Sequence, residues 1–418
     1  MKILIATAVY YPMVNGVAVF SYNLATGLAK RGHEVLVITP SQTGKNYAKM
    51  VDGVKECRLK STQARIYPDQ IHDVPVKKKL FGKEMPHIFY KHSIRVSVFP
   101  YRQVKKIFKE FKPDVVHVQV SDPIGLSVVS QARKNHVPVV TTEHNQPDVF
   151  TEPLHMPKLV KKPVDALLNA YFVNRQSKSD FVTMPTQQAI EKLILSRKKE
   201  FPVPVAAVSN GVDLTNFKPG KVPDEIYEKY KIKKNAPTVI YVGRIDPEKK
   251  VRMTLEAFKK VVSKIPDAQF VIVGDGVDRL NVEKDIKEYG LSDSVRVLGR
   301  VLQPDLFMLY RVGDVFATAS EIETQGIVLI EAAATGLPLI AVKAGAVAEV
   351  CRDGENGFLC EPKDIDAIAE SMYKILSDKD LQKKFSGASL EIASEHDLEK
   401  TIDKFLNIYS RVIEQATK

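Results

Sequence analysis

Short apolar runs alternate with stretches of helical spacing along most of the chain, and they do so in two successive series. The first series has apolar runs at residues 3–9 and 35–38, joined by a loop and a stretch of helical spacing. The second series opens at 237–243 and closes at 339–342. Fully apolar strands joined by helices are typical of parallel sheets that are covered on both faces. The pattern therefore predicts the α/β class, with two tandem Rossmann-like, doubly wound domains.

The join between the two series is expected near residues 203–220, where prolines and charged residues cluster. A length of 418 residues is enough for two or three domains. We therefore end the first domain at residue 203 and begin the second at 204. The sequence contains no uncharged apolar run of about 20 residues, the length needed to span a bilayer. Residues 3–9 resemble a short signal peptide, but the chain continues directly into the first series, which argues against that interpretation.

The excess of positive charge lies in the first half of the chain. The sequence has 61 Lys and Arg against 50 Asp and Glu, a net charge of +11. Residues 1–200 have 31 against 16 and a net charge of +15, whereas residues 201–418 have 30 against 34 and a net charge of −4. A basic domain suggests an anionic partner, either nucleic acid or a membrane surface. The three cysteines have neither paired nor metal-ligand spacing, which favours reduced thiols in a cytoplasmic protein.

Polar residues that follow strands are the candidates for a site, because ligands of open α/β sheets bind beyond the carboxyl ends of the strands. Asn15 and Gly16 follow the first strand, where a glycine lets backbone N–H groups approach a phosphate. A turn glycine without a ligand is the alternative. The Gly-x-Gly-x-x-Gly pattern is absent here and at 274–279, which argues against a nicotinamide or flavin enzyme. His144, and less strongly His117, ends a strand and could orient a sugar hydroxyl or shuttle a proton, although a lone histidine is more often structural.

Two cations follow the first strand of the second series. Arg244 and Lys249 are five residues apart in the sequence Gly-Arg-Ile-Asp-Pro-Glu-Lys-Lys, which reads as a strand-to-helix loop. In such a loop they can converge on a diphosphate and stabilise the charge of a leaving group. A solvated charge run is the alternative interpretation.

Glu323 and Glu331 form the most specific motif of the chain. The apolar run that starts at Ile327 reads as a buried helix, with Glu323 at its mouth and Glu331 inside it. A buried carboxylate needs a partner, which could be a structural Arg or Lys. Eight residues of helix cover about 12 Å, a length comparable with a sugar diphosphate between its hexose and its ribose. The two carboxylates could therefore hold opposite ends of one donor.

In order and spacing, these motifs resemble the retaining, nucleotide-sugar-dependent glycosyltransferases with the GT-B fold and the Glu-x7-Glu signature. That family includes bacterial diacylglycerol glucosyltransferases and phosphatidylinositol mannosyltransferases. The resemblance covers nearly the whole chain, and its motifs lie at residues 12–18, 32–35, 114–117, 142–144, 209–213, 243–249, 273–276, 323–331, 345–349 and 356–362.

The resemblance implies a GT-B architecture, with an acceptor domain at 1–203 and a nucleotide-sugar donor domain at 204–390 facing it across a cleft. It also implies that the C-terminal segment 391–418 crosses back onto the first domain as a helix. The family needs no metal and no cofactor apart from its donor substrate. Domain closure on donor binding is a further expectation.

The site residues that the resemblance implies fall into two groups. Those expected at the reacting centre are His144 beside the transferred sugar, Glu323 on that sugar, and Arg244 and Lys249 on the diphosphate. In the second group, Glu331 is expected on the ribose and backbone around Gly299 on the base. The residues expected to bind the rest of the donor are Asn15, Gly16, Gly243, Gly299, Arg300, Val301, Thr324, Gln325, Gly326, Ile327 and Glu331.

The sequence departs from the family pattern at a few positions. Thr324-Gln325 stands where many members have Ser-Phe or Pro-Phe, and a glutamine there is similar to the diacylglycerol glucosyltransferases. Lys250 replaces a common glycine, and Gly345-Ala346 replaces Gly-Gly. The last two departures affect loop geometry more than chemistry.

The acceptor is expected to bind the basic first half. Cations and large apolar residues interleave at 76–91 and 155–172, as in segments that lie in a membrane interface. Residues 104–112 read instead as an ordinary helix on the sheet, with its lysines in water. We therefore expect a peripheral enzyme at the cytosolic face of an anionic membrane, moving glucose from UDP-glucose to a lipid acceptor such as diacylglycerol.

Three alternatives remain open at the level of sequence. The first is a GDP-mannose-dependent lipid mannosyltransferase, and the second is a glycosyltransferase with a soluble acceptor. The third is a basic nucleic-acid-binding protein, although no nucleic-acid-binding module is recognisable.

Overall fold

The computed structural model describes residues 1–13, 15–68, 79–80, 83–84, 93–119, 122–144, 158–197 and 201–417. It divides into two compact units, which are Met1–Asn210 with Leu398–Lys418 (unit 1) and Gly211–Asp397 (unit 2). The sequence-based boundaries, after residues 203 and 390, lie several residues too early. Strand β12 (Val205–Ala207) still belongs to the sheet of unit 1, and helix α13 (Lys379–Ser394) packs in unit 2.

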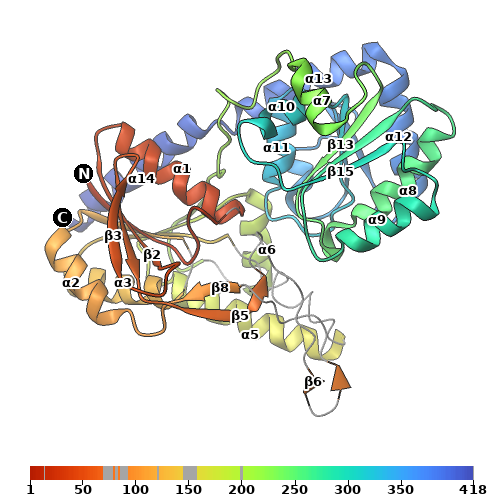
Figure 1. The fold of residues 1–418 in the computed structure, drawn as a ribbon. Coiled ribbons are helices and arrows are strands. Elements are labelled where there is room, and N and C mark those ends of the chain that lie inside the picture. Colours follow the sequence, from red (N-terminus) through yellow and green to blue (C-terminus); the bar gives the residue numbers. More distant parts are fainter. Residues whose placement is uncertain are drawn as a thin grey trace. The chain divides into compact units, whose positions relative to one another are not determined.

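Unit 1 is built on one sheet of eight strands (Figure 1). The apolar central strands are buried, whereas the edge strands β3 and β12 are not. Seven strands run parallel, and β3 is antiparallel to β4. In spatial order the strands are β12, β11 (Phe181–Met184), β10 (Val139–Thr142), β9 (Val115–Val118), β1 (Lys2–Ala6), β2 (Glu34–Pro40), β4 (Val54–Leu59) and β3 (Tyr47–Val51). Two small antiparallel pairs accompany this sheet, β5 (Thr62–Pro68) with β8 (Ser93–Val96) and β6 (Lys79–Leu80) with β7 (Lys83–Glu84).

Helices cover both faces of the unit 1 sheet, as expected for a doubly wound domain. One core joins the sheet to α1 (Gly16–Lys30) and to the C-terminal helix α14 (Leu398–Thr417), whose Phe405 and Tyr409 are fully buried. The other core joins it to α2 (Tyr101–Phe111) and α3 (Pro123–Lys134). The remaining helices of unit 1 are α5 (Lys158–Gln176) and α6 (Gln187–Arg197).

Unit 2 has a parallel sheet of six strands with the order typical of a Rossmann-like domain. The strands are β15 (Val295–Gly299), β14 (Gln269–Val273), β13 (Thr238–Val242), β16 (Val315–Ala317), β17 (Leu339–Val342) and β18 (Gly357–Cys360). Its helices are α7 (Asp224–Tyr230), α8 (Val251–Val262), α9 (Arg279–Glu288), α10 (Asp305–Val312), α11 (Ile327–Ala334), α12 (Ile365–Ser377) and α13, with short 3-10 turns at Pro247–Lys249 (η2) and Gly345–Glu349. Two apolar cores, one on each face, complete the unit.

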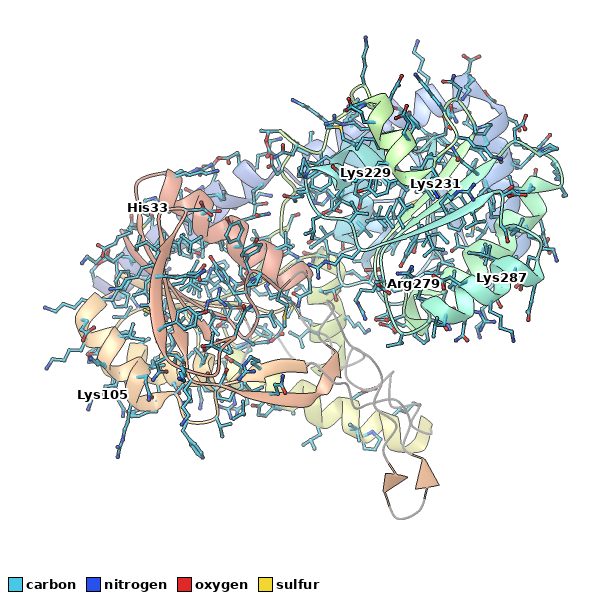
Figure 2. The ribbon with its side chains drawn as sticks, in the orientation of Figure 1. His33, Lys105, Lys229, Lys231, Arg279 and Lys287 are labelled. Atoms are coloured by element: carbon cyan, nitrogen blue, oxygen red, sulfur yellow. The ribbon has the colours of Figure 1, made fainter. Side chains whose placement is uncertain are left out.

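The sequence-based expectation for residues 104–112 is confirmed. Helix α2 buries Val104, Phe108 and Phe111 against the sheet, whereas Lys105 projects away from the unit (Figure 2). Most of the expected membrane segment 76–91 lies outside the described residues, and α5 covers the described part of 155–172. Across the described ranges, no helix has the length and apolarity needed to cross a bilayer.

Replacing Phe405 by alanine should destabilise unit 1, because the ring is fully buried between α14 and the sheet. Truncation of a buried Phe costs about 3–5 kcal/mol. Hydrogen–deuterium exchange should show lost protection in the unit 1 strands and unchanged protection in unit 2. Leu406→Ala, at a partly exposed position of the same helix, should cost less, and equal losses for the two variants would contradict this packing.

Candidate active site

Backbone packs directly on backbone at the carboxyl edge of the unit 2 sheet. The Gly243 N–H donates to the carbonyl of Val273 at 3.0 Å, and the Gly274 N–H donates to that of Gly299 at 2.8 Å. A Cβ on Gly274 would lie 1.8 Å from the carbonyl oxygen of Gly243, so only glycine fits there. These contacts bring the loops after β13, β14 and β15 together, and with them the predicted residues Gly243 and Gly299.

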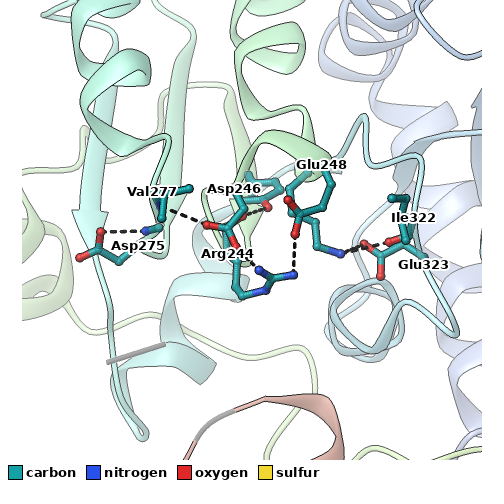
Figure 3. A network of polar contacts seen from close by, with 10 residues as sticks. Arg244, Asp246, Glu248, Asp275, Val277, Ile322 and Glu323 are labelled. Atoms are coloured by element: carbon teal, nitrogen blue, oxygen red, sulfur yellow. Dashed lines mark hydrogen bonds and ion pairs between the residues drawn. The ribbon is translucent and has the colours of Figure 1, made fainter. Parts of the chain in front are cut away.

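Arg244 is held by polar contacts on both sides of its loop (Figure 3). Its guanidinium donates to the carboxylate of Asp246 and, at 2.7 Å, to Glu248 Oε1. Its backbone carbonyl accepts the hydroxyl of the buried Tyr241 at 2.6 Å. About a third of the guanidinium side chain stays exposed, so this cation is held in place and still open to a ligand.

Lys249 connects the loop after β13 to the loop after β16. Its Nζ lies 2.7 Å from Glu323 Oε1 and 3.2 Å from the carbonyl oxygen of Ile322. Both side chains are largely buried, with 17% and 14% of their surfaces exposed. Arg244 and Lys249 are therefore ordered by carboxylates rather than free in solvent, and their place in a site stays a prediction.

The segment between Glu323 and Glu331 is only partly helical, which corrects the length estimate made from the sequence. Helix α11 begins at Ile327, after Gly326 in the left-handed conformation with a φ of 74°. Glu323 therefore lies in a loop, and the rise of a continuous helix does not apply to the pair. A Cβ on Gly345 would lie 2.4 Å from the carbonyl oxygen of Glu323, so a close glycine contact supports this loop.

Glu331 has a tyrosine as its partner, where the sequence suggested a cation. The hydroxyl of Tyr310 donates to Glu331 Oε2 at 2.6 Å. Burial raises the pKa of Glu331 to about 7, and the hydrogen bond from Tyr310 acts in the opposite direction. The carboxylate thus titrates near neutral pH, which is typical of groups at functional sites.

Asn15 and Gly16 belong to unit 1, at the start of α1. The Asn15 side chain accepts a hydrogen bond from the backbone N–H of Ala18 at 2.8 Å and so caps the helix. Gly16 is the first residue of the helix.

His144 follows β10 in unit 1 and belongs to a buried polar network. Its Nε2 donates to Gln119 Oε1 at 2.8 Å, and burial lowers its pKa to about 3. His117 bonds Tyr409 at 2.6 Å and Thr142 at 2.7 Å through its two ring nitrogens, which supports a structural role for this residue. A neutral His144 is suited to orienting a hydroxyl rather than to shuttling a proton.

The structure therefore separates the predicted site residues into two groups. Three are in unit 1. The others are in unit 2, in loops or turns after strands, apart from Gly299 at the end of β15 and Ile327 and Glu331 in α11. The unit 1 residues are Asn15, Gly16 and His144, and the unit 2 residues are Gly243, Arg244, Lys249, Gly299, Arg300, Val301, Glu323, Thr324, Gln325, Gly326, Ile327 and Glu331.

Five polar residues described in contact with the predicted set were missed from the sequence. Tyr241, Asp246 and Glu248 hold Arg244, Tyr310 holds Glu331, and Gln119 holds His144. A buried tyrosine or glutamine needs a hydrogen-bond partner, so the sequence signals that partners exist. It does not signal which partners, because that depends on how separate elements pack.

Two family descriptions match consecutive parts of the chain. Residues 14–216 match Glycosyltransferase Family 4, and residues 223–391 match Glycosyl transferases group 1. The chain is 28% identical over 369 residues to the alpha-monoglucosyldiacylglycerol synthase of Acholeplasma laidlawii, covering 86% of this chain and 84% of that protein. It is 25% identical over 410 residues to the N-acetyl-alpha-D-glucosaminyl L-malate synthase of Bacillus anthracis, covering 96% of each.

Solved structures share the fold at lower identity. The Anabaena protein Alr3699/HepE, crystallised in complex with UDP-glucose, is 19% identical, has a TM-score of 0.67 and covers 98% of this chain and 100% of its own. The predicted α/β class and GT-B fold are confirmed by this likeness and by the two parallel sheets.

Glu331→Gln should weaken binding of a nucleoside diphosphate by about tenfold or more, because a charged, partly buried acceptor is lost. For the same reason, wild-type affinity measured by calorimetry should fall between pH 8 and pH 6 as Glu331 becomes protonated. A wild-type affinity that does not change with pH would contradict the role of the ionised Glu331 carboxylate as an acceptor for the ligand.

Glu331→Gln should be at least as stable as the wild type at pH 8. The pKa of Glu331 is higher in the folded chain than its ordinary value of 4.5. The protonated group therefore contributes to the free energy of unfolding in full below pH 4.5, and this contribution is lost as pH rises through about 7. Thermal unfolding at pH 5 and pH 8 should therefore show a smaller loss in the variant than in the wild type. A larger loss in the variant would mean that the carboxylate has a structural role.

Proposed function

Because the chain belongs to the group 1 glycosyltransferases, a retaining and metal-independent class of GT-B enzymes, we propose that it transfers glucose from UDP-glucose to a membrane lipid such as diacylglycerol. The observation that carries the donor half of this proposal is the Lys249–Glu323 ion pair. In this proposal Lys249 binds phosphate and Glu323 binds sugar hydroxyls, and their charged atoms lie 2.7 Å apart in the loops after β13 and β16.

The donor diphosphate binds Arg244 and Lys249 in this proposal. Both cations are already oriented by carboxylates, Arg244 by Asp246 and Glu248 and Lys249 by Glu323. Cations fixed in advance stabilise the charge that develops on a leaving phosphate at little reorganisation cost. Glu331 accepts the ribose hydroxyls, and the backbone around Gly299 receives the base.

Retention of configuration follows, in the family's mechanism, from departure and attack on the same face of the sugar. The leaving phosphate takes the proton of the acceptor hydroxyl, so no protein nucleophile is required. His144 orients a sugar hydroxyl in the neutral form that burial imposes on it. Arg244 and Lys249 carry the electrostatic part of catalysis.

A lipid acceptor is supported by exposed apolar side chains in the basic unit. Leu167 and Tyr171 are 71% and 41% exposed one turn apart on α5, and Lys162 is exposed on the same helix. Val98 and Phe99, just before the lysine-rich α2, are 52% and 89% exposed. Apolar side chains flanked by cations suit an anionic membrane interface. The Thr324–Gln325 pair and the similarity to an alpha-monoglucosyldiacylglycerol synthase agree with this choice.

A soluble acceptor is the second candidate, because the chain aligns over 96% of its length with the N-acetyl-alpha-D-glucosaminyl L-malate synthase of Bacillus anthracis. Mass spectrometry of products should distinguish the candidates. The purified chain is incubated with UDP-glucose, UDP-galactose or GDP-mannose, each with a lipid extract or with L-malate. A hexosylated lipid formed only from UDP-glucose is expected, whereas a mannosylated lipid or a malate glycoside would overturn the proposed donor or acceptor.

Lys249→Ala should lower kcat by about 10²–10³-fold, the effect of removing one preorganised electrostatic donor. Lys229→Ala provides a matched control, because Lys229 also pairs with a carboxylate, Asp305 at 2.5 Å, but projects from the surface of unit 2 (Figure 2). Initial rates of UDP-glucose consumption should separate the two variants. Near-wild-type turnover of Lys249→Ala would refute the assignment of the diphosphate site.

Leu167→Glu with Tyr171→Glu should reduce sedimentation with anionic liposomes, because both side chains would lie in the interface. Leu280→Glu, at a 77% exposed position of unit 2, is the control and should sediment like the wild type. Binding of the wild type should weaken as salt is added. A membrane acceptor would be contradicted if the wild-type protein does not sediment with anionic liposomes. It would also be contradicted if the wild-type protein shifts nucleic acid in a gel at the same concentration.

A further inference from the structure

The ring of Tyr310 is held by packing against other side chains, and this packing does not require its hydroxyl group. It lies on α10 with none of its surface exposed. Its ring packs edge-on against Phe217, with centroids 5.6 Å apart, and stacks with Phe316 at 6.4 Å. The ring therefore has a single orientation, and a phenylalanine would fill the same space.

The hydroxyl points to Glu331 on the neighbouring helix α11. It donates to Oε2 at 2.6 Å, and burial raises the pKa of Tyr310 well above its ordinary value, so the hydroxyl keeps its proton. Since a carboxylate has two oxygens with separate lone pairs, occupation of Oε2 by the phenol leaves Oε1 to other donors. The contact thus selects one orientation of the carboxylate.

We infer that Tyr310 is the positioning residue that aims the Glu331 carboxylate at the hydroxyls of the donor ribose. This inference rests on the proposed role of Glu331 and extends it to a residue that does not itself contact the donor. Without the phenol, the partly buried Oε2 would lose its hydrogen-bond donor, which disfavours the ionised carboxylate. The carboxylate would also lose the contact that holds its rotamer.

A binding cycle tests the inference with the full chain. Calorimetry compares UDP with 2′,3′-dideoxy-UDP, which lacks the ribose hydroxyls, on the wild type and on Tyr310→Phe. UDP affinity should fall by about tenfold in the variant, whereas affinity for the dideoxy analogue should be unchanged. An equal loss for both ligands would indicate a general structural defect and overturn the inference.

Two further variants keep the result interpretable. Tyr230→Phe is the matched control, because Tyr230 also donates to a carboxylate at 2.6 Å, that of Asp305, outside the proposed site. It should bind UDP like the wild type. In a Glu331→Gln background, Tyr310→Phe should have no additional effect on UDP affinity, because the two residues act as one unit. Additive losses would overturn the inference even if the single variant is less stable.

Steady-state kinetics give an independent readout. Loss of a ribose contact that is made equally in the ground and transition states raises KM without lowering kcat, so Tyr310→Phe should raise the KM for UDP-glucose about tenfold. A fall in kcat at constant KM would contradict the positioning role. Failure of the proposed site is distinguishable, because unchanged UDP affinity in Glu331→Ala would refute the role of Glu331 itself.

Discussion

Direct contact between backbones at the carboxyl edge of the unit 2 sheet is the constraint on which the site depends. Gly274 sits so close to the carbonyl of Gly243 that a side chain cannot be accommodated, and Gly345 approaches Glu323 in the same way. These contacts replace side-chain packing with hydrogen bonds between loops. The loops that present Arg244, Lys249 and Glu323 are thereby held against a rigid sheet, as precise electrostatic catalysis requires.

The charged groups of the proposed site are arranged in pairs. Lys249 and Glu323 satisfy each other in a largely buried location, and Arg244 is held by two carboxylates. Leaving one member of such a pair alone would cost free energy. Glu331 differs, because it has a neutral phenol as partner and its pKa is raised. A carboxylate kept under these conditions is better explained by ligand binding than by stability.

The fold could be predicted largely from the sequence, and the contacts within the site only in part. Apolar runs and glycine-containing loops predicted two Rossmann-like sheets, and the positions of Arg244 and Lys249 after β13 followed from the same pattern. The hydrogen bonds of Tyr310 to Glu331 and of Gln119 to His144 could not be predicted, because 21 and 25 residues separate the partners. The loop position of Glu323 was also missed, since Gly326 delays the start of α11. The local sequence pattern indicates where helices and strands lie, whereas the pairing of side chains depends on how these helices and strands pack.

The most direct test of the account is a crystal structure of the full chain with bound UDP. The account predicts diphosphate oxygens within hydrogen-bond distance of the Arg244 guanidinium and Lys249 Nζ. It also predicts ribose hydroxyls on Glu331, with the Tyr310 hydroxyl still on Oε2. A diphosphate that contacts neither cation, or a ribose placed away from Glu331, would contradict it.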